Sequence, residues 1–361
     1  MVKARLKRLS IESWTNTRIE PGETRNVQLA VSQNYSGTTV HIPLQVRRSD
    51  QDGPVVFVTA ALHGDELNGT GAIRHLLRDP EIQLVRGSLI LVPVLNILAL
   101  ESRSRYMPDR RDLNRCFPGS ASGSLASRMA YSIFHEIVAR SDFGIDLHTA
   151  SVRRTNFPTV RGTMEDESVA KLARAFGSEI IIDKPGPKSS LRREASANQC
   201  PTIIMEGGEV WKVEPAIVDT AVLGVKNVLK SLGMLEGKPL RPNCQVVISK
   251  TRWMRAEFGG FLQFHIAPGE IVEKGQPLTT NTSLLGDELG VLVAPFDGVI
   301  IGLTTLPTVN PGEPICHIGR FPKGTNAPEI RRLRDSQSNL EERVSDELAT
   351  NLRVVERKPG Q

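Results

Sequence analysis

Hydrophobic, strand-like runs alternate with amphipathic helical patterns through the middle of the chain, from Pro54 to about Gly233. Each of four apolar runs, VVFVTAAL, SLILVPVL, FGIDLH and PTIIMEG, precedes a stretch with the apolar spacing of a helix. The last helical stretch starts at Pro215 and stops at Gly233, and both residue types favour those positions. The alternation predicts an α/β domain with a mostly parallel or mixed sheet covered on both faces.

The segments on either side follow other patterns. Short alternating runs at 27–31 and 39–46 are typical of edge β-structure. The composition changes at GKPLRPN, residues 237–243, and the chain from there to about Arg320 is rich in Gly, Pro and short β-like runs. The predicted organisation is a β-structured segment over 1–50 packed on the catalytic domain, an α/β domain over 51–236, a smaller all-β domain over 243–320 and a charged tail over 321–361.

Charge and composition argue against a nucleic-acid-binding protein and against a membrane protein. The net charge is only +5 and the basic residues are scattered, so we expect no nucleic-acid partner. No apolar stretch approaches the length of about 18 residues that a membrane helix needs, and the N-terminal residues lack the apolar core of a signal peptide. Four widely separated cysteines suit a reducing compartment, and we therefore expect a cytoplasmic protein that does not contact membranes.

Polar residues follow the predicted strands, where α/β sheets bind ligands. His63 and Glu66 come after the first run, Asn96 after the second, His148 within the end of the third and Glu206 at the end of the fourth. Taken singly, His63 is best interpreted as a surface turn residue and His148 as a buried, hydrogen-bonded one. Two imidazoles and a carboxylate that converge from strand ends instead predict a zinc site with an open fourth position.

The other five histidines show no metal-ligand spacing, and we interpret them as structural or surface residues: His41, His75, His135, His265 and His317.

A set of ordered motifs extends this pattern: HGDE at 63–66, RY at 105–106, DLNRCFPG at 112–119, DLHTA at 146–150, LRREA at 191–195 and MEGGE at 205–209. With these motifs the chain resembles the succinylglutamate desuccinylase and aspartoacylase family, which is related to the zinc carboxypeptidases. The resemblance covers about residues 54–235. It implies a zinc carboxypeptidase-like catalytic domain and the deacylation of an N-acylated amino acid.

The resemblance also implies a role for particular residues. It makes His63, Glu66 and His148 the ligands of one zinc ion per chain. It makes Glu206 the general base and acid, and Arg105 the group that polarises the scissile carbonyl. The residues that it assigns to substrate binding are Asn114, Arg115 and Arg192.

Three of these roles have plainer alternatives. Arg105 lies in a run with several arginines, ESRSRYMPDRRD, and can be one solvated charge among many. Glu206 can instead be a strand-end carboxylate paired with an arginine, and Arg115 can pair with Asp112 and merely brace its loop.

The segment 266–300 is similar to a biotinyl or lipoyl carrier domain. The hairpin region from Thr279 to Gly290, where such domains bear the modified lysine, contains no lysine. We therefore expect the fold to be reused without carrier chemistry, as a lid or a contact between subunits, which leaves open a homo-oligomer.

These observations predict a metal-dependent deacylase that cleaves the amide of a small, carboxylate-bearing N-acyl amino acid with metal-activated water and a glutamate base. The alternative enzyme is a zinc carboxypeptidase that acts on peptides and needs an extended open cleft. A non-catalytic carrier or binding module is a third interpretation, and the missing hairpin lysine counts against it.

Overall fold

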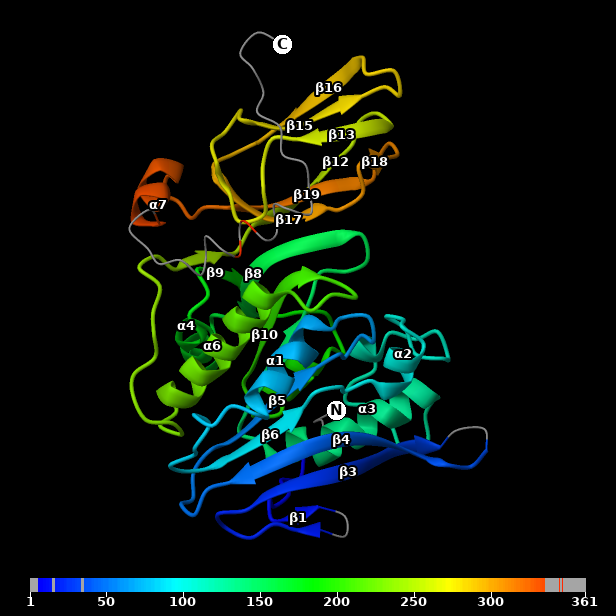
Figure 1. Cartoon of the computed structure of the whole chain (residues 1–361), viewed down its shortest axis with the longest axis vertical. Coiled ribbons are helices and arrows are strands. Elements are labelled where there is room, and N and C mark those ends of the chain that lie inside the picture. Colours follow the sequence, from blue (N-terminus) through cyan, green and yellow to red (C-terminus); the bar gives the residue numbers. More distant parts are fainter. Residues whose placement is uncertain (1–5, 15–16, 34–35, 335–343, 345, 347–361) are drawn as a thin grey trace.

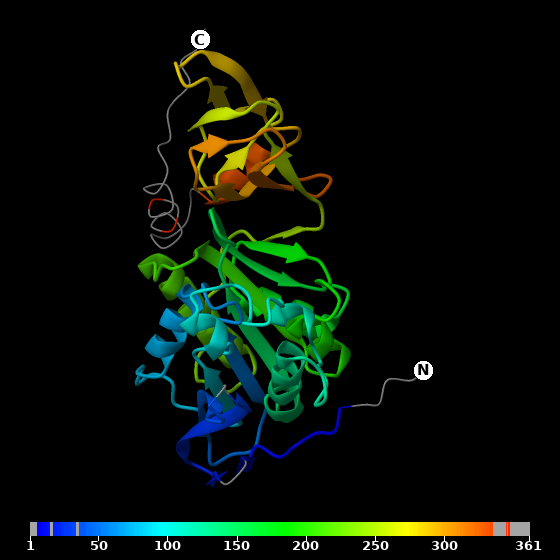
Figure 2. The same ribbon diagram turned by 90° about the vertical axis from the view of Figure 1, so that its right-hand side faces the viewer.

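The computed structural model describes residues 6–14, 17–33, 36–334, 344 and 346. These residues form a larger lobe of mixed helices and strands and a smaller lobe of strands, stacked along the long axis (Figures 1 and 2). Much of the segment expected to be a charged tail, 321–361, lies outside the described residues; the part inside forms helix α7 (Ala327–Arg334).

The centre of the larger lobe is a mixed sheet. Its four inner strands run parallel in the order β6-β5-β7-β10. On one side β8 pairs antiparallel with β10, and on the other β4 and β3 form an antiparallel hairpin beyond β6. The strands are β3 (Thr24–Gln33), β4 (Thr39–Arg48), β5 (Val55–Ala60), β6 (Ser88–Val92), β7 (Phe143–His148), β8 (Arg154–Gly162), β9 (Ile180–Asp183), β10 (Thr202–Glu209) and β11 (Val246–Ile248).

The sequence of each strand suits its place in the sheet. The inner strand β6, SLILV, is apolar at almost every position and buried throughout, because helices cover both of its faces. The hairpin strand β3 instead alternates, with Val27, Leu29 and Val31 buried between exposed neighbours. The predicted α/β mixed sheet is confirmed, and the edge β-structure expected near the N-terminus extends this same sheet.

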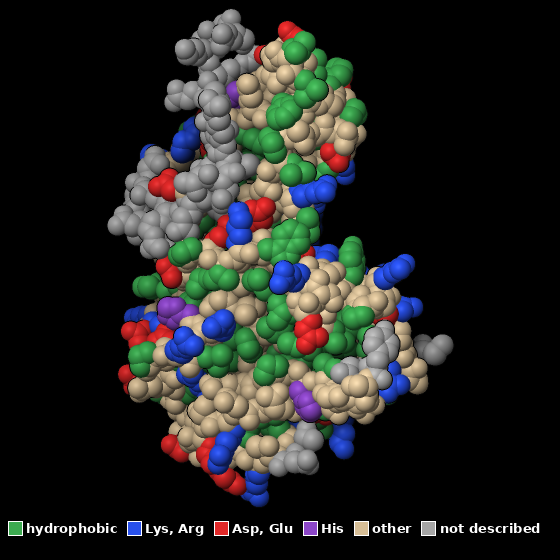
Figure 3. All heavy atoms as spheres, turned by 45° about the vertical axis from the view of Figure 1, so that its right-hand side comes forward, with side chains coloured by type: hydrophobic (Ala, Val, Ile, Leu, Met, Phe, Trp, Pro, Cys, Tyr) green, Lys and Arg blue, Asp and Glu red, His purple; other side chains and the backbone are tan. Residues whose placement is uncertain are grey.

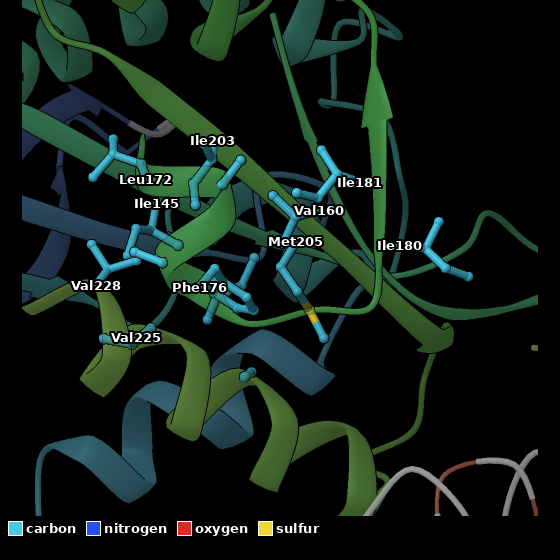
Figure 4. Packing of buried hydrophobic residues seen from close by; sticks show 14 of the residues in the cluster. Ile145, Val160, Leu172, Phe176, Ile180, Ile181, Ile203, Met205, Val225 and Val228 are labelled. Atoms are coloured by element: carbon cyan, nitrogen blue, oxygen red, sulfur yellow. The ribbon is translucent and has the colours of Figure 1, made fainter. Parts of the chain in front are cut away.

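Helices cover both faces of the sheet. On one face α1, α4 and α6 pack against β5, β7, β8 and β10 in the core seen in Figure 4, which includes Ile145, Val160, Phe176 and Met205. On the other face α3 and α5 pack with the β3–β4 hairpin. The helices are α1 (Asn68–Leu76), α2 (Ile97–Glu101), α3 (Leu125–Glu136), α4 (Glu167–Phe176), α5 (Leu191–Ala197) and α6 (Pro215–Ser231), and short 3₁₀ turns span Leu113–Arg115 and Val138–Arg140.

The smaller lobe consists of strands, and its sheet continues the catalytic one. Of the segment 243–320, β11 pairs with β9 in the larger lobe. Strand β17 pairs with β8, so β17, β19 and β12 extend the large sheet, and a separate four-stranded sheet in the order β16-β15-β13-β18 packs against them. The strands are β12 (Thr251–Arg255), β13 (Gly260–Phe264), β14 (Ile271–Val272), β15 (Pro277–Thr282), β16 (Glu288–Val293), β17 (Gly298–Thr304), β18 (Thr308–Val309) and β19 (Pro314–Arg320). A small sheet of β1 (Ser13–Trp14) and β2 (Thr17–Arg18) completes the described strands. The likeness to a biotinyl or lipoyl domain stays a prediction.

Charged side chains of both signs are interspersed over the face shown in Figure 3, which agrees with the scattered charge of the sequence. Every helix within the described ranges is too short or too polar to cross a bilayer.

Candidate functional site

The turn after β5 brings His63 and Glu66 together. Its tight course needs Gly64, because a Cβ at this position would lie 2.0 Å from the carbonyl carbon of Ala99. The backbone N–H of Gly64 donates to the carbonyl of Ser104 at 3.0 Å, and that of Glu66 donates to the carbonyl of His63 at 3.1 Å. The turn therefore holds both side chains on the same side of the sheet edge.

His148 completes the group from the end of β7. Nδ1 of His63 lies 2.6 Å from Oε1 of Glu66, and Nδ1 of His148 lies 2.8 Å from Oε2 of the same carboxylate. All three side chains are buried, and one ligand atom from each lies within 4.8 Å of the others. Among the described residues, this is the one group of three or more that could hold a metal ion.

A second carboxylate holds the far side of each imidazole. Nε2 of His63 lies 3.2 Å from Asp112, and Nε2 of His148 lies 2.8 Å from Asp146. Each Nε2 can donate to the carboxylate that it faces, and Nδ1 of His63 also lies 3.2 Å from Nη1 of Arg105. Metal-binding histidines usually donate their other ring N–H to such a carboxylate, which leaves Nδ1 as the ligand atom in both residues.

The electrostatics of the group also fit a cation. Burial alone would lower the pKa of His148, but the charges of Asp146 and Glu66 raise it well above its ordinary value, and Glu66 raises the pKa of His63 against the same effect. Burial alone would raise the pKa of Glu66, and the two imidazoles bring it far below its ordinary value. Two imidazole nitrogens and a carboxylate that lie together in a buried group are a donor set that suits a divalent ion, so the residues present fit a metal.

Arg105 lies beside this group. Its guanidinium donates to Glu66 at 3.3 Å and to Asp112 at 3.2 Å, and the side chain is 24% exposed. The arginine expected near the scissile carbonyl is therefore within a hydrogen bond of a candidate metal ligand.

The two residues of the DLNR motif have different environments. Asn114 is buried, and its Oδ1 accepts a hydrogen bond from the backbone N–H of Leu191 at 2.9 Å, so its Nδ2 is the group left to donate elsewhere. Arg115 is half exposed and lies 4.0 Å from Asp112. Its Nη1 also donates to the backbone carbonyl of Asn114 at 2.9 Å, so the bracing role and the recognition of a carboxylate both stay predictions.

Arg192 is almost fully buried on α5. Its Nε and Nη1 atoms have no hydrogen-bond partner within the described part of the chain. Burial and the nearby charge of Arg161 lower the pKa of Arg192 to about 10, so it stays cationic at neutral pH. A buried guanidinium with unpartnered N–H groups is suited to an anionic ligand.

Glu206 lies on β10 directly beside His148 on β7. Its Oε2 accepts from Nη2 of Arg161 at 2.6 Å and from Nδ2 of Asn156 at 3.3 Å. The carboxylate thus has the arginine partner that the plainer alternative expects, and it also faces the cavity that contains the metal group.

All eight residues singled out from the sequence line one cavity of about 530 Å³. The eight are His63, Glu66, Arg105, Asn114, Arg115, His148, Arg192 and Glu206.

The residues that form one wall of this cavity were not predicted from the sequence. Trp253 of β12 and His317 of β19 stack with ring centroids 4.4 Å apart, and the guanidinium of Arg154 lies 4.6 Å from the Trp253 ring. The interpretation of His317 as structural or surface did not place it at the site, because it lies in the segment assigned to another domain and has no informative spacing. The sequence also did not point to three other residues of the cavity, because no motif or spacing around them indicates a site: Arg161, Asn156 and Lys184.

Residues 52–232 match the model of the succinylglutamate desuccinylase/aspartoacylase catalytic domain. The chain belongs to this family. It is therefore an amide hydrolase of the deacylase type, as the sequence predicted.

Relatives agree with this assignment. Over 307 residues, 81% of this chain and 90% of the relative, the chain is 25% identical to the N-alpha-acetyl-L-2,4-diaminobutyric acid deacetylase of Halomonas elongata. A shorter match, 34% identical over 119 residues and 30% of this chain, is to an N-acyl-aromatic-L-amino acid amidohydrolase of Xenopus tropicalis, of which it covers 37%.

Solved structures share the fold. A succinylglutamate desuccinylase/aspartoacylase from Rhodobacter sphaeroides superposes with a TM-score of 0.71 at 26% identity over 83% of this chain and 96% of that one. The product-bound ectoine utilization protein EutE (DoeB) of Ruegeria pomeroyi gives a TM-score of 0.73 at 22% identity over 84% of this chain and 98% of that one. Both alignments extend beyond the catalytic domain into the smaller lobe.

Replacement of both candidate histidine ligands should empty the metal site. We expect the purified protein to carry one divalent ion per chain, and the His63→Ala, His148→Ala double variant to carry almost none, because one carboxylate remains of three ligands. Elemental analysis of the dialysed proteins measures this. The exposed His41→Ala variant is the control and should keep the ion. Full occupancy in the double variant would show that the ion binds elsewhere.

His317 should make the protein sensitive to acid. Burial and the charges of Arg161, Lys184 and Arg154 lower the pKa of His317 to about 3. Its unfolded pKa is about 6.5, so protonation favours the unfolded state, and stability is lost as pH falls from about 6.5 towards 3.

Urea unfolding at pH 7.5 and pH 5 should therefore show a smaller loss of stability in His317→Phe, which keeps a ring for stacking, than in the wild type. The two losses of unfolding free energy should differ by at most about 1.4 kcal/mol for each pH unit below the unfolded pKa of His317. Equal losses in both proteins would mean that His317 is not held neutral by the fold.

Proposed function

We propose that the protein is a zinc-dependent deacylase that hydrolyses the amide of a small N-acyl amino acid with a free carboxylate. One observation supports this proposal above all. A single cavity is lined by a buried group of two histidines and a glutamate, by a second glutamate and by several cationic side chains.

His63, Glu66 and His148 would hold the zinc ion. Bound zinc lowers the pKa of a water molecule to ~7 and polarises a carbonyl oxygen. Asp112 and Asp146 fix the ring orientation of the two histidines through their Nε2 atoms, so that both Nδ1 atoms face Glu66.

Glu206 is suited to move the proton. In amide hydrolysis the hydroxyl of water bonds to the acyl carbon, the C–N bond breaks, and the remaining proton is transferred to the leaving amine nitrogen. A carboxylate next to the ligand group can accept this proton from water and donate it to the amine. Glu206 lies directly beside His148 on the neighbouring strand, which supports this role.

The cationic side chains suit the rest of the substrate. Arg105 would donate to the amide carbonyl oxygen, and its contact with Glu66 supports this role. Asn114, Arg115 and Arg192 offer an amide donor and two guanidinium groups to a carboxylate, the group that a guanidinium can bind through two parallel hydrogen bonds.

The cavity favours a small substrate over a peptide. Trp253 and His317 of the smaller lobe form part of its wall, whereas a carboxypeptidase needs a groove that extends along the chain of its substrate. The Halomonas elongata relative, named as a deacetylase of an acetylated amino acid, supports the same class of substrate.

A substrate panel tests the proposal. The zinc-loaded enzyme is assayed with N-acetyl, N-succinyl and N-formyl amino acids and with dipeptides and tripeptides. We expect at least one N-acyl amino acid to be cleaved with about tenfold or greater preference in kcat/KM over the peptides. Preference for peptides would favour the carboxypeptidase alternative and contradict the proposal.

Glu206→Gln should keep the metal and the fold but lower kcat by about a hundredfold or more, because the amide cannot accept the proton and general acid–base catalysis contributes ~10²- to 10⁴-fold. Steady-state kinetics with metal analysis measures this. Glu209→Gln, a change of the same kind three residues further along β10, should remain active. Near wild-type turnover of Glu206→Gln would leave Glu206 a structural partner of Arg161.

Arg115→Ala should lower kcat/KM by roughly thirtyfold or more, because a lost contact between a guanidinium and a carboxylate costs about 2 to 5 kcal/mol when it is desolvated. The measurement compares a substrate acid with its methyl amide on both enzymes. Recognition of the carboxylate predicts that the variant no longer distinguishes the two, whereas equal losses on both would indicate a bracing role. Arg111→Ala, in the same loop and paired with Asp109, is the control.

A further inference from the structure

The pairing of β8 with β10 determines which β8 side chains reach Glu206. Arg161 lies opposite Ile204, and Thr159 lies opposite Glu206. Directly opposed residues of an antiparallel pair share a face, and so do residues two apart on one strand. Arg161 is therefore a diagonal neighbour of Glu206 on the same face, within reach of a long side chain.

An irregularity in β8 adds a second neighbour. From Glu206 to Gly208 strand β10 advances by two residues, while β8 advances by three, from Thr159 to Asn156. The additional residue lies at Phe157–Pro158, and proline is tolerated at such a bulge because it has no N–H to donate. Without the bulge Asn156 would face away from Glu206; with it, Asn156 joins Arg161 on the face of the cavity.

Both neighbours bind the same atom of Glu206. Arg161 Nη2 lies 2.6 Å from Oε2, and Asn156 Nδ2 donates to Oε2 at 3.3 Å. In the described chain, Oε1 of Glu206 takes part in no hydrogen bond. The two side chains thus fix one oxygen of the carboxylate and leave the other available.

Strand β17 makes room for this arrangement. Gly302 lies opposite Asn156, and a Cβ there would lie 2.2 Å from Oδ1 of Asn156. A larger residue would displace the carboxamide, so the position of Asn156 depends on glycine in the smaller lobe.

We infer that Arg161, together with Asn156, is a positioning residue for the reaction: it holds Glu206 through Oε2 so that Oε1 is free to take and return the proton. The inference rests on the proposed role of Glu206. The competing role for Arg161 is direct binding of an anionic group on the substrate, and the experiments separate the two.

The first experiment is a double-mutant cycle of Arg161→Met and Glu206→Gln in the zinc-loaded enzyme. Arg161→Met should lower kcat by about 10- to 100-fold, since a small misplacement of a reacting group has an effect of that size, and should change KM less than threefold. The same change in the Glu206→Gln background should lower kcat by less than about twofold, because Arg161 acts through Glu206.

The kinetics also compare two kinds of substrate and include one control variant. The loss in kcat should be equal for N-acyl amino acids with a neutral and with an acidic side chain. Arg25→Met removes an arginine that pairs with Glu23 at the same distance, 2.6 Å, at an exposed position of β3, and should leave kcat and KM unchanged. A rise in KM confined to the acidic substrate, additive losses in the cycle, or unchanged kcat in Arg161→Met would each overturn the inference.

The second experiment does not depend on activity. Crystal structures of the wild type and Arg161→Met are compared, with metal content measured to show an intact site. We expect the Glu206 carboxylate to rotate or lose its defined position in the variant, and an unmoved carboxylate would overturn the inference. A wild type without activity on any N-acyl amino acid would instead refute the proposed function, and the crystallographic result would still decide whether Arg161 positions Glu206.

Discussion

Buried charge that must be balanced governs the architecture of this site. Glu66 and Asp146 are buried, and Asp112 is partly buried, beside two imidazoles at the end of the central sheet, where an unpaired charge would be costly. Each ring nitrogen therefore faces a carboxylate. The tight turn at Gly64 brings His63 and Glu66 together. A divalent ion held by the two Nδ1 atoms and Glu66 would supply positive charge at the point where these carboxylates gather.

The topology of the sheet brings the remaining chemistry to this point. Parallel strands β5, β7 and β10 end at the same edge, so the residues at their ends, His63, His148 and Glu206, converge. The antiparallel strand β8 passes beside them and supplies arginines from the flank instead of from a strand end. Because β8 also pairs with β17, the smaller lobe is joined to the catalytic sheet and contributes the wall formed by Trp253 and His317.

The alternation of strands and helices and the candidate ligands could be predicted because both depend on short-range signals. A buried strand is an apolar run, and His63 and Glu66 are three residues apart in one turn. The contacts of Arg161 and His317 could not be predicted, because they depend on the pairing of β8 with β10 and β17, on the bulge at Phe157–Pro158 and on strands more than 100 residues distant along the chain. The same pairing explains why the smaller lobe, expected as a separate domain, shares a sheet with the larger one.

We propose that these residues form a zinc centre in which Asp112 and Asp146 determine the ligand atoms of the two histidines. Anomalous diffraction at the zinc edge, from crystals of the zinc-loaded protein, tests it most directly. We expect one strong peak at about 2.0 to 2.2 Å from Nδ1 of His63, Nδ1 of His148 and the carboxylate of Glu66, with both Nε2 atoms still on Asp112 and Asp146. A peak at the Nε2 atoms, or none at this group in a protein that binds zinc, would contradict it.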